Sequence, residues 1–348
     1  RRDSTRRKRS REMTFHAVKE NVNGTAILIG YEDYRPYFIG QATLRMPEGL
    51  CKKLRDPEDE GLLYSFSPAA CLRLLIQLPP HGGAKVLFVD GYAEDEHQAA
   101  QMITRYLGIP NLNGHTLDSS FSKMRKLLSH ESSGNHDTLR QPHQEKALSP
   151  DAGVFSFSGD GTELHMGWKT PRPWAHIMAN EKGYGAIAAN DGDIYSFMGN
   201  AQQNGLTPFN FGSTLVQTPS QILYLFNQST GKAETPTYAP LRQKDAQYRI
   251  TFGRGYVIYR KVQENVDLEY TLAVLPDQPA EVRLLTVRNR GNEMITYRIV
   301  PYFQMMLGEE PFDSVGKIVA RFDDVRKAFF FSNPDNDFHK GWAFVATS

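Results

Sequence analysis

The feature that most constrains the fold is a succession of short, strand-like segments between residues 151 and 348. "AGVFSFSGDGTELHMGW" and "QILYLFNQSTGKAETPT" each place a turn rich in Gly, Asn or Asp between two strands. In "EVRLLTVRNRGNEMITYRIV", Val282 and Leu284 alternate with Arg283 and Leu285, so the two pairs face opposite sides of a strand. Strands spaced by roughly 8–12 residues predict an all-β sandwich.

The N-terminal part carries the same pattern and ends in a helix. "TAILIGY" predicts a buried strand, and "RPYFIG" predicts a second short one. "ACLRLLIQLPPHGGAKVLFVDGY" predicts a hairpin, because "PPHGG" supplies the turn residues between two alternating strands. In "EDEHQAAQMITRYLGI", Ala99, Met102, Ile103 and Tyr106 share one helical face.

A polar segment separates the two strand-rich parts. Residues 111–150 are rich in Ser, His, Asn, Gln and Lys, with one weak amphipathic helix in "SSFSKMRKLLSH". The predicted division is therefore a β domain in residues 1–110, a linker in 111–150 and a β domain in 151–348. There is no βαβ alternation and no Gly-rich phosphate loop, which argues against a nucleotide-binding fold.

Composition excludes several classes of function. The 348-residue chain has a net charge of +1, so we expect no nucleic-acid partner, and its basic N-terminus is read as a solvated edge. Cys51 and Cys71 are too few for a disulfide framework, and no Cys/His cluster has metal-ligand spacing. The expected setting is reducing and cytoplasmic.

No residue of this chain is predicted to be catalytic. Asp191 and Asp193 flank a Gly, and Asp323 lies in "FDDVRK", so turn formation explains these acids better than a glycosidase pair does. His176 lies on or beside a strand and is read as a core or rim histidine. No Ser occurs in a G-x-S-x-G context.

Two segments contain candidate carbohydrate contacts. Trp174, in "TPRPWAHIMAN", is either a core residue or a platform for a sugar ring. In "DIYSFMGNAQQNGLTPF", Tyr195 lies on a strand, and the following turn carries Asn200 and Asn204. Amides can both donate to and accept from sugar hydroxyls, but Asn in such a turn also caps its own backbone. The pattern alone slightly favours the capped turn.

These residues carry a resemblance to a known family. The stretch from "TPRPWAHIMAN" to "NGLTPF" resembles the N-terminal β-sandwich domain of glycoside hydrolase family ninety-four (glycosyltransferase family 36-type). The family includes cellobiose and 1,2-β-oligoglucan phosphorylases and the phosphorylase-like part of cyclic β-1,2-glucan synthases. The matching positions are Thr170, Pro171, Pro173, Trp174, Asn180, Tyr195, Gly199, Asn200, Asn204, Leu206, Thr207 and Pro208.

The N-terminal part resembles the closing half of such a domain. Its "YEDYRPYFIGQ" is similar to an E-x-x-R-x-x-F-x-G-R segment, with Gln41 in place of the last Arg. The resemblance implies a mainly β, galactose-mutarotase-like supersandwich with a short helical linker. Residues 1–110 would be the closing half of a first sandwich, and residues 151–348 the opening part of a second.

The resemblance also implies a function. The chain would be the β-sandwich portion of an inverting phosphorylase that acts on β-1,2-linked glucooligosaccharides, with inorganic phosphate as co-substrate and no cofactor or metal. The catalytic acid would lie in an (α/α)6 barrel following residue 348. The alternatives are a non-catalytic carbohydrate-binding module and a fragment of a cyclic β-1,2-glucan synthase.

The same resemblance implies the partners. Trp174, Tyr195, Asn200, Asn204 and Thr207 would face a β-glucan oligosaccharide or a partner domain. That domain would be the catalytic barrel or, in a homodimer, a second copy. Gly205 and Phe209 replace residues that are often Arg and Trp in relatives, so contacts at this loop would differ.

Overall fold

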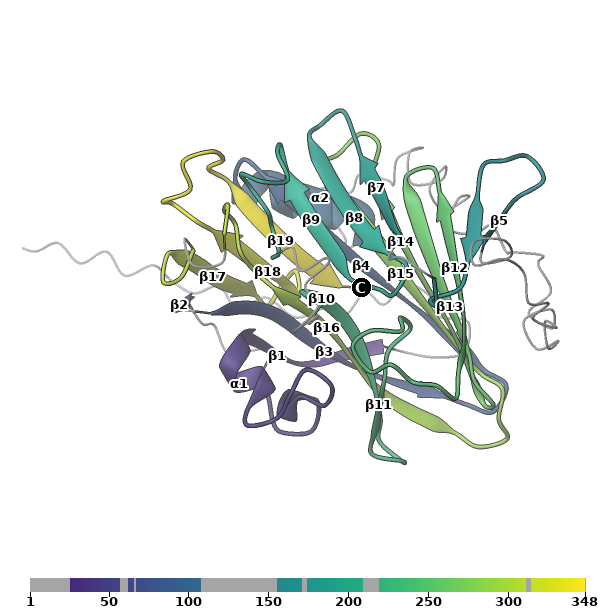
Figure 1. Ribbon diagram of the computed structural model, residues 1–348. Helices are drawn as coiled ribbons and strands as arrows, with labels where there is room; N and C mark the ends of the chain where they lie inside the picture. Colours follow the sequence, from purple (N-terminus) through teal and green to yellow (C-terminus); the bar gives the residue numbers. More distant parts are fainter. Residues whose placement is uncertain are drawn as a thin grey trace, which may run out of the picture.

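The computed structural model describes seven stretches of the chain, which are residues 26–56, 62–65, 67–107, 155–170, 174–208, 219–310 and 314–347. They form mainly antiparallel β-sheets, as Figure 1 shows, so the predicted β-sandwich class is confirmed. The weak helix predicted within 111–150 and the basic N-terminal residues lie outside the described residues.

Two large sheets contain most of the strands. The five-stranded sheet has, in spatial order, β1 (Ala26–Tyr34), β3 (Pro68–Leu78), β16 (Ile295–Gln304), β10 (Gln221–Asn227) and β11 (Lys232–Glu234). The eleven-stranded sheet has β2 (Leu62–Ser65), β17 (Ile318–Asp323), β18 (Ala328–Ser332), β19 (Trp342–Thr347), β4 (Gly83–Ala93), β15 (Ala280–Asn289), β14 (Val266–Val274), β13 (Tyr256–Val262), β12 (Gln247–Gly253), β6 (Leu164–Met166) and β5 (Phe155–Phe157).

A third, three-stranded sheet carries the candidate loop. It consists of β7 (Ala175–Ala179), β8 (Tyr184–Ala189) and β9 (Ile194–Met198). One of its faces contributes Met178, Tyr184, Ala186 and Ile194 to the main core. Because β7 and β8 both contact β14, this sheet packs over the eleven-stranded sheet, as Figure 1 also shows.

The three helical segments cover the outer faces of the sandwich. The predicted helix is confirmed as α2 (Glu96–Leu107), whose apolar face packs on β4 and β19. The 3-10 helix η1 (Glu48–Leu50) lies next to α1 (Arg35–Ile39), and the α1–η1 region covers the five-stranded sheet.

The strand predicted in "RPYFIG" is wrong, because these residues form α1. Pro36 lacks the N–H that a strand ladder needs and fits the first turn of a helix. Gly40 ends the helix at φ 68°, and its N–H donates to the Pro36 carbonyl at 2.8 Å. The helix turns Phe38 onto the ring of Tyr302, at 5.5 Å between centroids, and this burial outweighs the extended pattern.

The two strands predicted in the hairpin are present as β3 and β4, but the predicted hairpin is wrong, because these strands do not pair with each other and enter different sheets. β3 lies between β1 and β16, while β4 lies between β19 and β15. The strands predicted on the two sides of residues 111–150 therefore pair with one another in both large sheets.

The core lies between the sheets and follows the alternation of the strands. On β4, Phe88 faces the core between the sheets, while the adjacent Val89 packs in the cluster beneath α2. On β15, Leu285 belongs to the inner core and Val282 to the α2 cluster, as the sequence predicts. Both faces of the central strands are buried, which explains their near-continuous apolar runs.

The acidic turns have structural roles, as predicted. Asp323 accepts the backbone N–H of Arg326 at 2.8 Å and pairs with its guanidinium at 2.6 Å, which closes the turn between β17 and β18. Asp191 accepts the N–H of Asp193 at 3.3 Å in the turn between β8 and β9. His176 is half-buried on β7, with its Nε2 2.6 Å from the Gly253 carbonyl.

Phe88→Ala should lower the free energy of unfolding by about 3–5 kcal/mol, because it leaves a cavity between the two large sheets. Phe88 is 1% exposed, whereas Phe157 on β5 is 65% exposed, so Phe157→Ala should change stability by less than about 0.5 kcal/mol. Equilibrium unfolding in urea measures both. A loss below about 1 kcal/mol for Phe88→Ala would contradict this core assignment.

Candidate functional site

The turn after β9 folds back along its own strand. Met198 N–H donates to the Asn204 carbonyl at 3.1 Å, and Leu206 N–H donates to the Ser196 carbonyl at 2.8 Å. Gly205 forms isolated bridges with Phe197 on one side and with residue 308 on the other. Backbone hydrogen bonds thus fix the path of the loop over residues 198–206.

Tyr195 and Asn204 hold this loop from inside. The buried Tyr195 hydroxyl donates to the Ala201 carbonyl, and burial raises the pKa of Tyr195 to about 12. Asn204 is fully buried, donates to the Met198 carbonyl at 3.2 Å and accepts from the Asn336 amide at 2.8 Å. A direct contact between Asn204 and a sugar would require the loop to rearrange.

Asn200 lies at the exposed tip of the same loop. Its side-chain oxygen accepts the backbone N–H of Gln202 at 2.8 Å, which is the capped turn that the pattern favours. Gln202 and Gln203 are exposed beside it. The tip therefore presents amide groups to solvent, while the base of the loop is internal.

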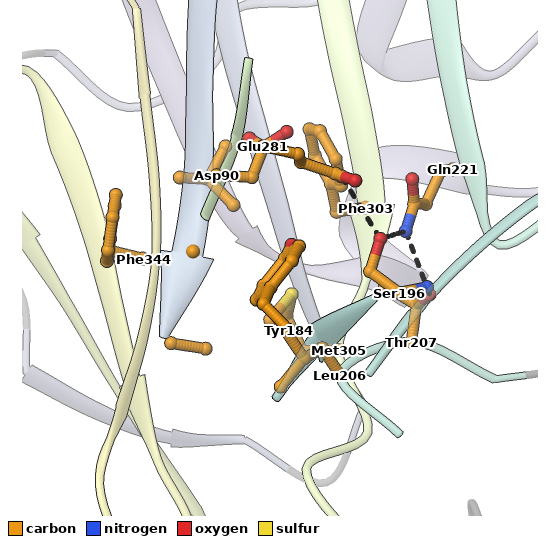
Figure 2. Close-up of a pocket in the computed structure, with 13 residues that line it drawn as sticks. Asp90, Tyr184, Ser196, Leu206, Thr207, Gln221, Glu281, Phe303, Met305 and Phe344 are labelled. Carbon is orange, nitrogen blue, oxygen red and sulfur yellow. Dashed lines mark hydrogen bonds between the residues drawn. The ribbon is translucent and has the colours of Figure 1, made fainter. Parts of the chain in front are cut away.

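Thr207 connects the loop to a buried polar network, part of which is drawn in Figure 2. The Gln221 amide donates to the hydroxyls of Thr207 and Ser196, each at 2.9 Å. The Ser196 hydroxyl in turn donates to Glu281 at 3.0 Å. Thr207 is buried, so its hydroxyl positions the loop rather than facing solvent.

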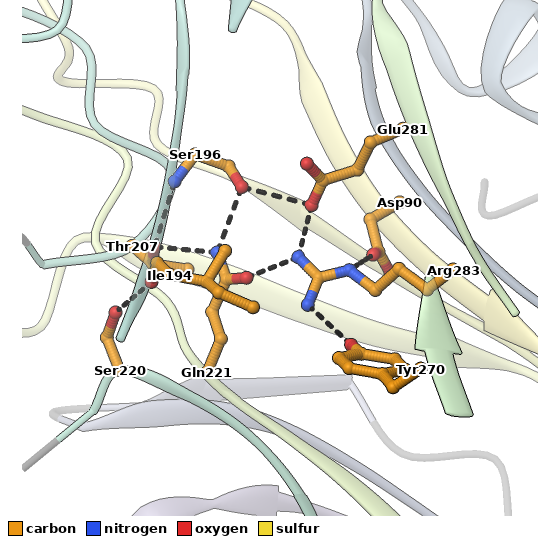
Figure 3. A network of polar contacts seen from close by, with 9 residues as sticks. All are labelled: Asp90, Ile194, Ser196, Thr207, Ser220, Gln221, Tyr270, Glu281 and Arg283. Atoms are coloured by element: carbon orange, nitrogen blue, oxygen red, sulfur yellow. Dashed lines mark hydrogen bonds and ion pairs between the residues drawn. The ribbon is translucent and has the colours of Figure 1, made fainter. Parts of the chain in front are cut away.

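Arg283 is the centre of this network (Figure 3). Its Nε lies 2.6 Å from an Asp90 oxygen, and its Nη1 donates to the Tyr270 hydroxyl at 3.0 Å. Its Nη2 donates to Gln221 and Glu281. Burial alone would lower the pKa of Arg283, but Glu281, Tyr270 and Asp90 together raise it.

Burial of the Asp90 carboxyl is energetically unfavourable. Burial raises the pKa of Asp90 to about 7, although the Arg283 charge opposes this shift. Sequence analysis did not single out Arg283, Asp90 or Glu281. The only available signal was a charged pair, Glu281 and Arg283, on the same face of a strand that is otherwise apolar.

A small cavity adjoins the network, and Figure 2 shows its lining. Tyr184, Phe303, Met305 and Phe344 form its apolar walls, with Asp90 among its polar groups. Its volume of about 20 Å³ accommodates a water molecule but not a sugar ring. The buried network is therefore a structural feature and not a glycan site.

Trp174 is the candidate whose ring reaches solvent. It is 39% exposed and packs against Phe155 at 5.3 Å between ring centroids. The backbone N–H of Trp174 donates to the side-chain oxygen of Asn190 at 3.2 Å, and the Asn190 amide also donates to the Trp168 carbonyl and the Thr170 hydroxyl. This asparagine, which sequence analysis missed, anchors the segment that presents Trp174.

The structure thus separates the five predicted residues into two groups. Trp174 and Asn200 are accessible, whereas Tyr195, Asn204 and Thr207 are buried and hold the loop. Among the described residues, no group of three or more His, Cys, Asp or Glu side chains could hold a metal ion. No helix in the described part of the chain is long and apolar enough to cross a membrane.

The fold defines a class of protein, namely a large antiparallel β-sandwich, on which Trp174 and the tip of the loop at Asn200 are exposed. The family model described as "Glycosyl hydrolase 94, supersandwich domain" matches residues 1–109 and 162–348. The chain belongs to this family, and the predicted resemblance is confirmed.

One curated relative extends this comparison. The chain is 27% identical over 186 residues to the cyclic beta-(1,2)-glucan synthase NdvB of Rhizobium meliloti (strain 1021). The match covers 52% of this chain and 6% of the relative, so the chain corresponds to a small part of that much longer protein.

Arg283→Met should destabilise the fold by about 3–5 kcal/mol, because it leaves Asp90 and Glu281 buried without their cation. Arg321→Met removes the partner of Glu96 at the surface, where the two side chains are 34% and 39% exposed, and should cost less than about 1 kcal/mol. Urea unfolding of both variants tests this difference. Equal losses would show that Arg283 does not neutralise the buried carboxyls.

The buried carboxyl of Asp193 should make the free energy of unfolding depend on pH. Burial, and then the charge of Asp191, raise the pKa of Asp193 to about 7. Between about pH 4 and pH 7 the folded state therefore holds a proton that the unfolded state has lost. The free energy of unfolding should fall as pH rises through this window, by at most about 1.4 kcal/mol per pH unit.

Asp193→Asn should remove this contribution, since the amide does not titrate. The measurement is the difference between variant and parent in urea unfolding at pH 5 and at pH 8. The variant should gain stability relative to the parent at the higher pH. A difference that is the same at both pH values would contradict the raised pKa.

Proposed function

We propose that this chain is the β-sandwich portion of a phosphorylase that acts on β-1,2-linked glucooligosaccharides, with inverting phosphorolysis performed by the full-length protein. The family match over residues 1–109 and 162–348 is the observation that carries this proposal. The printed name of the relative, which concerns a cyclic beta-(1,2)-glucan, supports the linkage.

In this proposal the sandwich supports catalysis and does not perform it. A carboxylic acid in an (α/α)6 barrel outside these residues protonates the glycosidic oxygen, while inorganic phosphate attacks the anomeric carbon. The sandwich contributes the accessible Trp174 ring and the Asn200 amide to the β-glucan side of the site. Its partners are that barrel and, in a homodimer, a second copy, in a cytoplasmic setting without a cofactor.

A second candidate is a segment of a cyclic β-1,2-glucan synthase, which the 27% identity to such a synthase favours. The two candidates differ in the reaction that the complete reading frame supports. Incubation with β-1,2-glucooligosaccharides and inorganic phosphate should release glucose 1-phosphate. Cyclic glucan from a nucleotide-sugar donor, with no phosphate-dependent release, would overturn the phosphorylase in favour of the synthase.

Trp174→Ala should weaken binding of β-1,2-glucooligosaccharides to this chain roughly fivefold or more, because a stacking aromatic contributes about 1 kcal/mol. Asn200→Ala should have a smaller effect in the same direction. Tyr37, which is 48% exposed on α1, provides a matched control, since Tyr37→Ala should leave binding unchanged. Isothermal titration calorimetry measures all three, with circular dichroism to verify folding.

If the parent binds the sugar and Trp174→Ala leaves the dissociation constant unchanged, the sugar binds elsewhere on the sandwich. No binding at millimolar sugar would assign this chain a purely supporting role. Saturable binding by a complete reading frame that lacks phosphorolysis would instead favour the third possibility, a carbohydrate-binding module.

A further inference from the structure

The boundary between the two strand-rich parts runs through the interior of both large sheets. We name residues 26–107 the N-terminal segment and residues 155–347 the C-terminal segment. The N-terminal segment inserts β3 between its own β1 and β16, and β4 between β19 and β15. Without it, the eleven-stranded sheet would be interrupted between β19 and β15, and the five-stranded sheet would end at β16.

Four strand ladders cross this boundary. They are β3–β16, β4–β15, β4–β19 and β2–β17, all antiparallel. The β4–β15 ladder, for example, runs without a register shift from Gly83, opposite Arg288, to Gly91, opposite Ala280. Such ladders resemble an obligate protein interface, because separation would expose unpaired backbone groups on both sides.

Side chains join the same two segments. The buried Asn289 amide donates across the boundary to the carbonyls of Leu78 at 3.2 Å and Pro79 at 3.0 Å. Arg35 Nε donates to the Tyr302 hydroxyl at 2.9 Å. The ion pair between Asp90 and Arg283 also spans the boundary, so the buried carboxyl of the N-terminal segment is paired with a guanidinium of the C-terminal segment.

We propose that the two segments are complementary halves of one sandwich and that they bind each other non-covalently, independently of the peptide that connects them. The surface formed by β15, β16 and β19 is thus a protein-binding surface. Its partner is the N-terminal segment of the same chain. The ladders, the shared apolar core and the crossed ion pair supply the binding, and residues 108–154 supply only covalent linkage.

Cleavage of the folded full chain tests this proposal. A protease recognition sequence flanked by Gly and Ser is inserted between residues 108 and 154, and complete cleavage is verified on a denaturing gel. The two fragments should co-elute in gel filtration at the elution volume of the uncleaved chain. They should remain together on dilution to about 0.1 µM, as expected for a stable interface of this kind.

Separation of the fragments under these native conditions would overturn the proposal. Release only in denaturant supports non-covalent pairing within one chain.

Asn289→Ala in the same cleavable chain should weaken the association of the fragments roughly tenfold, since two carbonyls of the N-terminal segment lose their buried donor. Asn292→Ala alters an exposed asparagine between β15 and β16 and serves as the matched control, with no change expected. Fluorescence titration of labelled fragments gives both dissociation constants. An unchanged constant for Asn289→Ala would contradict the assigned interface.

Discussion

The consecutive strands β3 and β4, joined by a short turn, form the element on which the rest of the sandwich depends. Its turn carries the chain from the five-stranded sheet to the eleven-stranded sheet, and each strand then pairs on both of its edges. Every backbone N–H and C=O in the middle of these strands therefore needs a partner from a distant part of the sequence. This pair of strands connects the two sheets, and the inner core, which contains Phe88 and Leu285, fills the space between them.

The buried charges at the same place are a cost that the surrounding structure offsets. Arg283, Asp90 and Glu281 lose hydration in the interior, and such ion pairs seldom add to stability. Their geometry does fix position, because Arg283 reaches Asp90 on β4, Tyr270 on β14 and Gln221 on β10 at once. Only one relative placement of these strands satisfies all three groups.

Local patterns in the sequence predicted the class of fold, the two strands β3 and β4 with the turn between them, α2 and the acidic turns, since each depends on neighbouring residues. They could not predict that β3 and β4 enter different sheets, because pairing partners more than 200 residues apart leave no local pattern. The strand expected around Pro36 was wrong because the burial of Phe38 on Tyr302 outweighs local preference. At the candidate loop, the sequence named the relevant residues but could not separate the exposed Asn200 from the buried Asn204, since both are amides in one turn.

The loop and the junction of the two segments are physically connected, which gives the buried network a consequence at the surface. Thr207 at the base of the loop is held by Gln221, which is held by Arg283, which pairs with Asp90 of the N-terminal segment. The position of the loop therefore depends on the presence of β4, although β4 contributes nothing to the exposed tip. A segment remote in sequence thus sets the geometry with which Asn200 is presented to whatever approaches this face.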